Sequence, residues 1–63
     1  MTKTEAMILK SLYVESFRSM FRPSIDLLTM RERKAADGMA VAGLIETRWV
    51  TRDDNRIYQA VAM

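Results

Sequence analysis

Cationic side chains gather in two short stretches of the sequence, and they are the residues best suited to binding a negatively charged group. They are Arg31, Arg33 and Lys34 in the first stretch, and Arg48, Arg52 and Arg56 in the second. Seven of the ten basic residues of the chain are arginine, whose planar guanidinium group suits phosphate and base edges better than an ammonium group does. The simpler interpretation is a solvated surface, in which carboxylates such as Glu32 and Asp53 balance the charge.

Catalytic and metal-binding chemistry has few candidate residues in this chain. The sequence contains neither histidine nor cysteine, which removes the commonest general base, the commonest metal ligand and every thiolate. Asp53 and Asp54 are adjacent in an expected turn, a spacing that suits neither an acid–base pair nor a metal cage. The sequence has no glycine-rich phosphate loop. We therefore expect no catalytic residues, no cofactor and no metal site, and we expect that the protein is not an enzyme.

The length and the composition limit the architecture. A chain of 63 residues forms one domain, residues 1–63, with a thin core and a stability on the order of 3–5 kcal/mol. The composition is typical of globular proteins. No run approaches the roughly 18 apolar residues of a membrane span, and the first residues lack the apolar segment of a secretion signal. We therefore expect a cytoplasmic protein without a membrane partner.

The first third of the chain has the pattern of an amphipathic helix. Thr2 and Glu5 have the spacing of a capping box. Behind them, apolar residues recur at intervals of three and four, namely Ile8, Leu9, Leu12, Tyr13, Phe17 and Met20. Pro23 then requires the helix to stop just before it. The pattern predicts helical structure over residues 3–21, either as one helix or as two helices with a bend near Glu15.

The segment 24–42 fits two arrangements. Its apolar residues lie roughly at helical spacing, namely Ile25, Leu28, Ala35, Ala36, Met39 and Ala42. Ser24 is a suitable helix cap with an acidic residue in the following turn, so that one arrangement is a single helix over the whole segment. The other arrangement has a short helix at 24–28, a turn near Thr29, and a second helix from about Arg31.

The two glycines have different expected roles. Gly38 lies inside the helical pattern, where glycine costs roughly 1 kcal/mol relative to alanine. Together with neighbouring alanines it leaves a face with little bulk that another element can approach. Gly43 is expected to end the helix as a left-handed cap, with Leu44 and Ile45 folding back onto the core.

Residues 47–61 have the alternating pattern of a β-hairpin. Two alternating runs are separated by Arg-Asp-Asp-Asn at 52–55, and Asp and Asn tolerate the positive φ angles of tight turns. The pattern predicts two antiparallel strands. Trp49 and Tyr58 are expected to form a cross-strand aromatic pair on the inner face.

This order of elements resembles the winged helix-turn-helix domain, and the sequence details are most similar to the MarR-like branch of bacterial regulators. There the recognition helix typically ends in Gly-Leu-Val or Gly-Leu-Ile, and a hairpin follows with Asp-x-Arg near its tip. The matching residues are Gly43-Leu44-Ile45-Glu46, then Arg48, then Asp54-Asn55-Arg56. The resemblance covers about residues 24–62.

The resemblance implies a small α+β fold of winged-helix type, with two to three helices followed by a C-terminal antiparallel β-hairpin. It implies that double-stranded DNA is the partner, that helix 31–42 lies in the major groove, and that the wing at 47–61 clamps the backbone. The residues expected to contact DNA are Thr29, Arg31, Arg33, Lys34, Arg48, Arg52 and Arg56. The implied role is a transcriptional or replication accessory regulator of a bacterium or bacteriophage. A domain this small would need a dimer or a second protein for useful specificity.

A second hypothesis keeps the fold but replaces DNA by a protein partner. The net charge is only +2, and acidic residues lie at the expected hairpin tip, whereas DNA-binding proteins usually carry a larger basic excess. In this hypothesis the protein is an adaptor or inhibitor, for example one encoded by a phage, that does not bind DNA, and a partner protein docks on Phe17, Met20 and Phe21, or on the exposed edge of the hairpin. Removing Arg31 and Arg33 should abolish DNA binding and leave protein docking nearly intact.

Overall fold

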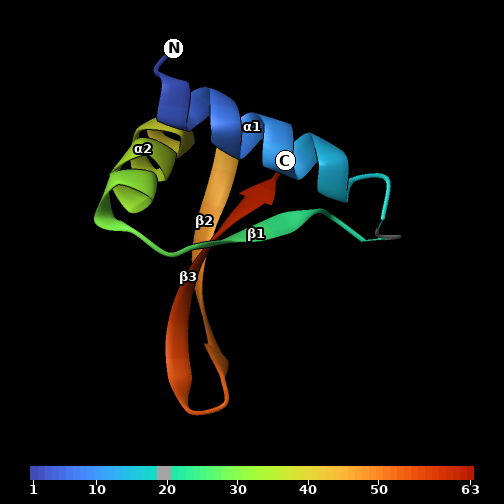
Figure 1. The fold of residues 1–63 in the computed structure, drawn as a ribbon, viewed down its shortest axis with the longest axis vertical. Helices are drawn as coiled ribbons and strands as arrows, with labels where there is room; N and C mark the ends of the chain where they lie inside the picture. Colours follow the sequence, from blue (N-terminus) through green and yellow to red (C-terminus); the bar gives the residue numbers. More distant parts are fainter. Residues whose placement is uncertain (19–20) are drawn as a thin grey trace.

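Two helices and a three-stranded antiparallel sheet make up the part of the chain that the computed structural model describes, residues 1–18 and 21–63. The elements follow the order α1 (Lys3–Glu15), β1 (Ser24–Leu27), α2 (Met30–Val41), β2 (Ile45–Arg52) and β3 (Asn55–Ala62). Both helices lie toward one end of the sheet, and the β2–β3 hairpin projects beyond them (Figure 1). The expected α+β class is confirmed.

The sheet has the order β1-β3-β2, so β3, the third of the described strands in sequence order, is the central one. Ile45 lies opposite Ala62 at one end of the hairpin, and Arg52 lies opposite Asn55 at the other. The shorter β1 pairs only with residues 58–61 of β3. The half of the hairpin near its tip is therefore a two-stranded ribbon.

Helix α1 begins as expected but ends earlier than expected. The capping box is present, because the Thr2 hydroxyl accepts from the Glu5 N–H and the Glu5 carboxylate accepts from the Thr2 N–H. The helix stops at Glu15, near the expected bend, and no second helix follows within the described residues up to 18. The Ser16 hydroxyl donates to a carbonyl one turn back, and the next two N–H groups bond three residues back, which tightens the last turn. The expected stripe residue Met20 lies outside the described residues.

The expectation of a helix at 24–28 is wrong, because Ser24–Leu27 is strand β1. Leu27 is fully buried in the core, whereas its neighbour Asp26 faces the other side of the sheet. There the Asp26 carboxylate accepts a hydrogen bond from the Gln59 side chain of β3. This is the alternation of a strand, and a run of four residues is too short for periodicity to reveal it. The single helix over 24–42 is therefore wrong as well, whereas the break near Thr29 in the other arrangement is confirmed, and α2 starts one residue before the expected Arg31.

The C-terminus of α2 is the expected glycine cap. Gly43 has φ +78°. Its N–H donates to the Ala40 carbonyl, and the Leu44 N–H donates to the Met39 carbonyl, which is the Schellman arrangement. Ile45 is buried as expected, whereas Leu44 remains half exposed and does not fold onto the core.

The core lies between the helices and one face of the sheet. Its buried members are Ile8 and Leu12 of α1, Ala36 and Met39 of α2, and Leu27, Ile45 and Ala60 of the strands. The core therefore fixes α2 against the base of the hairpin. The hairpin strands are as expected, with bounds one or two residues wider than 47–61.

Candidate nucleic-acid interface

Thr29 is the N-cap residue of α2. Its hydroxyl oxygen lies 3.2 Å from the Glu32 nitrogen, from which it accepts, and 2.9 Å from a Glu32 carboxylate oxygen, to which it donates. The Glu32 carboxylate in turn accepts from the Thr29 N–H at 3.2 Å. The hydroxyl expected to contact DNA is thus already engaged within the chain.

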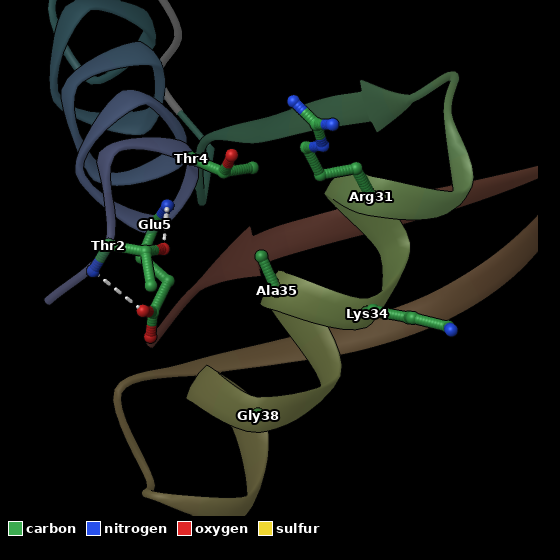
Figure 2. A pocket seen from close by; sticks show the side chains of 7 residues that line it. All are labelled: Thr2, Thr4, Glu5, Arg31, Lys34, Ala35 and Gly38. Atoms are coloured by element: carbon green, nitrogen blue, oxygen red, sulfur yellow. Dashed lines mark hydrogen bonds between the residues drawn. The ribbon is translucent and has the colours of Figure 1, made fainter.

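Arg31 and Lys34 are exposed on α2 and form no ion pair among the described residues. Both line a groove of about 470 Å³ between the start of α1 and α2. Figure 2 shows that the Lys34 side chain extends away from α1, whereas the Ala35 side chain points toward α1. Of the residues expected to contact DNA, these two cations are the least engaged by other described residues.

Arg33 and Arg56 meet at the ring of Trp49. The guanidinium carbon of Arg33 lies 5.5 Å from the ring centroid, and that of Arg56 lies 4.9 Å from it. Arg33 comes from α2 and also donates to the Leu27 carbonyl at 3.3 Å, whereas Arg56 comes from β3 near the hairpin tip. The indole therefore holds a cation of the helix and a cation of the hairpin on one surface.

Trp49 also forms the expected pair with Tyr58. The two residues are register partners, and their ring centroids are 4.7 Å apart. The Tyr58 hydroxyl donates to the Asp37 carboxylate of α2, and this hydrogen bond raises the pKa of Tyr58 above its ordinary value. The aromatic pair thus joins α2 to the hairpin through two contacts. Arg33 of α2 stacks on Trp49, and Asp37 of α2 accepts the hydrogen bond from Tyr58.

Arg48 and Arg52 lie on the opposite face of the sheet. Strand alternation separates them from Trp49, and their contacts show the same. Arg48 donates to the Gln59 side chain at 3.1 Å, Gln59 donates to Asp26 at 2.8 Å, and Arg52 donates to Asp26 at 3.1 Å. Gln59 is only 5% exposed although it faces away from the helices. This network ties both arginines to the sheet.

The hairpin tip is acidic and has a left-handed backbone. Asp53 has φ +51° and Asp54 has φ +64°, as the turn residues of the sequence predict. The Asn55 side chain donates to the Asp53 carbonyl at 3.3 Å. A phosphate group would approach the hairpin from the side more easily than at the tip, because both tip carboxylates repel it.

The seven expected residues therefore fall into separate groups. Arg31 and Lys34 lie on the exposed part of α2, Arg33 and Arg56 lie at Trp49, and Arg48 and Arg52 lie on the far face, while Thr29 caps the helix. Neither the network of Asp26 and Gln59 nor the stacking of two arginines on Trp49 was expected from the sequence. The alternation of the hairpin could have revealed only part of the network, because it places Gln59 beside Arg48 across the strands. The contact of Gln59 with Asp26 requires β1, and that of Arg33 with Trp49 requires the packing of α2, so neither follows from the hairpin pattern.

The described residues contain no group of three or more side chains placed to hold a metal ion. Within the same residues, neither helix has the length and apolar character needed to cross a bilayer. Comparison of the chain with protein-family models, curated proteins and solved structures found no match.

Proposed function

We propose that this protein is a small winged helix-turn-helix domain that binds double-stranded DNA. Helix α2 enters the major groove, and the β2–β3 hairpin is the wing that lies along the sugar-phosphate backbone. In a bacterium or bacteriophage such a domain would regulate transcription or assist replication.

The observation that best supports this function is the meeting of α2 and the hairpin at Trp49. Arg33 and Arg56 come from the two elements that would touch DNA, and both are held over one indole ring. Because a stacked guanidinium loses less freedom when it binds a phosphate, the pair is prepared for a backbone contact. The projecting hairpin gives this surface the reach to extend beyond α2 (Figure 1).

Helix α2 itself presents a side chain suited to the major groove. Its solvent side carries Lys34, flanked by the exposed apolar residues Met30 and Val41. Lysine can bind guanine O6 and N7, and apolar side chains can contact the thymine methyl group. The major groove is about 12 Å wide and admits a helix of this kind.

Titration of a fluorescein-labelled mixed-sequence duplex tests the proposal, with anisotropy read at about 50 and 200 mM salt. We expect binding that weakens steeply with salt, because each neutralised phosphate releases counterions. The double variant Arg33→Gln/Arg56→Gln should bind more weakly and with a shallower salt dependence. No binding at low salt and high protein concentration would overturn the proposed function.

The matched control is Lys10→Gln/Arg18→Gln, which removes two exposed cations near α1. Its net charge equals that of the test variant, so a general electrostatic attraction would weaken both equally. We expect the control to stay close to the wild-type affinity. Equal losses would show that total charge governs binding and that the Trp49 surface has no special part in it.

A second candidate function, protein docking, is favoured by an apolar groove of about 280 Å³ at the other end of α1. Leu9, Tyr13, Leu44 and Met63 are among its lining residues, and Phe17, packed edge-to-face on Tyr13, is 74% exposed. The occupant proposed is a second copy of the chain, because a single domain of this size makes few DNA contacts and a dimer doubles them. Of the residues expected for docking, Met20 lies outside the described residues.

Sedimentation equilibrium at several concentrations tests this candidate. We expect the average mass to rise with concentration, and Phe17→Ser to shift the association to higher concentration. A monomeric mass across the whole range would exclude self-association through this groove.

A further inference from the structure

Gly38 occupies an unusual position in α2. It lies inside the helix, where glycine is less stable than alanine. Apart from the two adjacent residues and the backbone of the helix itself, no atom of the described chain lies within 4 Å of the position that a β-carbon would take on Gly38. The described part of the chain therefore gives no packing reason for a glycine at this place. A bare backbone is also what allows a ligand to approach a helix closely.

Gly38 is one of the lining residues of the groove between α1 and α2. Arg31, Ala35 and Gly38 recur at intervals of four and three, so they share one flank of α2. Thr4 of α1 lies on the opposite wall, and its hydroxyl has no hydrogen-bond partner among the described residues. Figure 2 shows Arg31 at one end of this flank and Gly38 at the other. The groove thus combines a cation, a hydroxyl group and a surface without bulk.

The opposite flank of α2 faces the hairpin, through the contact of Arg33 with Trp49 and of Asp37 with Tyr58. A helix in a major groove has one sugar-phosphate strand on each side. If the hairpin lies along one strand, the α1–α2 groove faces the other.

We propose that the groove between α1 and α2 binds the phosphodiester backbone of the second DNA strand, with Gly38 as the point of closest approach. Arg31 neutralises a phosphate at the groove, and the Thr4 hydroxyl donates to a phosphate oxygen. The inference rests on the proposed DNA binding and assigns it a second backbone contact.

The groove also contains one carboxylate, that of Glu5. Its Oε1 accepts from the Thr2 N–H at 2.9 Å, so this oxygen is turned toward the start of α1 (Figure 2). Two cations, Arg31 and Lys34, outweigh it in the lining. The first N–H groups of α1 also favour an anion nearby.

The variant Gly38→Gln tests the groove without changing the charge. Glutamine is a better helix former than glycine, and the space at residue 38 is open, so we expect an unchanged or higher melting temperature by circular dichroism. The same side chain fills the groove. We expect duplex affinity to fall by at least about tenfold, with a shallower dependence of affinity on salt.

The control is Ala6→Gln, which adds the same kind of side chain at an exposed site of α1 that does not line the groove. A second variant, Arg31→Gln, is compared with Arg18→Gln. If Arg31 and Gly38 act on the same strand, Arg31→Gln/Gly38→Gln should lose less affinity than the two single losses combined.

The outcomes distinguish a failure of the groove contact from a failure of DNA binding itself. Wild-type binding with Gly38→Gln as tight as Ala6→Gln would overturn the groove contact and leave DNA binding in place. If the losses of affinity at residues 31 and 38 are fully additive, Arg31 and Gly38 do not contact the same DNA strand. Absence of wild-type binding would overturn both the function and the groove contact.

Discussion

At the scale of single residues, the two glycines give opposite predictions for the same substitution. Gly43→Ala places a β-carbon at φ +78° and should lower the free energy of unfolding by about 1 kcal/mol. Gly38→Ala lies in a regular helix with open space around it and should raise that free energy by about 0.5–1 kcal/mol. Urea unfolding of both variants provides the measurement. A loss of stability at residue 38 would show that glycine is required there for the fold.

Tyr58 predicts a pH dependence at the same scale. Because the hydrogen bond to Asp37 raises the pKa of Tyr58, folding favours the neutral phenol. Its contribution to stability is fully present below the unfolded pKa of about 10 and is lost as the pH rises through the folded pKa. In a Tyr13→Phe background, absorbance near 295 nm should report a midpoint above the ordinary value.

Asp37→Asn supplies the control for this titration. Without the carboxylate, the midpoint of Tyr58 should move down toward its ordinary value. An unchanged midpoint would show that another group sets the pKa.

At the scale of elements, a substitution at the start of α2 allows the effect of helix capping on stability to be measured separately from any effect on DNA binding. Thr29→Ala removes both hydroxyl contacts with Glu32 and should cost about 1 kcal/mol of unfolding free energy. Because the hydroxyl is engaged within the chain, the salt dependence of duplex binding should stay the same. A shallower dependence, measured well below the melting temperature, would restore Thr29 as a phosphate contact.

The sequence predicted those elements that are determined locally. The capping box of α1, the glycine cap at Gly43 and the Asp-Asp turn each depend on neighbours within a few residues, and all three are confirmed. Strand β1 was missed because its structure comes from pairing with residues 58–61, far away in the sequence.

The chain just before β1 also depends on distant partners. The Pro23 carbonyl accepts from the Ala62 N–H at 2.9 Å, and Arg22 donates to the Ala62 carbonyl at 2.8 Å. These contacts hold the chain before β1 against the end of β3. Local periodicity contains no information about such a partner.

The candidate site was predictable as residue types but only partly as geometry. The two basic clusters contain Arg33 and Arg56, which the fold brings together, and Arg48 and Arg52, which it places on the other side. Strand alternation separates Arg48 from Trp49, but the pairing of Arg52 with Asp26 requires β1 beside β3. That strand was not expected from the sequence.

At the scale of the whole molecule, the cations of the hairpin are divided between two faces, and a duplex can lie against only one of them. Arg48→Gln/Arg52→Gln should therefore weaken duplex binding less than about twofold, whereas Arg33→Gln/Arg56→Gln should weaken it far more and reduce the salt slope by about two phosphates. The two variants have equal net charge, so anisotropy titrations of both show which face of the hairpin the duplex contacts. The reverse order of affinities would place the DNA on the side of Asp26 and Gln59.

The position of β3 has a consequence for the order in which the chain can fold. This strand follows β1 and β2 in the sequence but lies between them in the sheet. While the chain leaves the ribosome, β1 and β2 have no partner, because they pair with β3 and not with each other. The core around Leu27 and Ile45 therefore stays incomplete until residues 58–62 emerge. Assembly of the sheet therefore requires β3, the third of its strands to be synthesised.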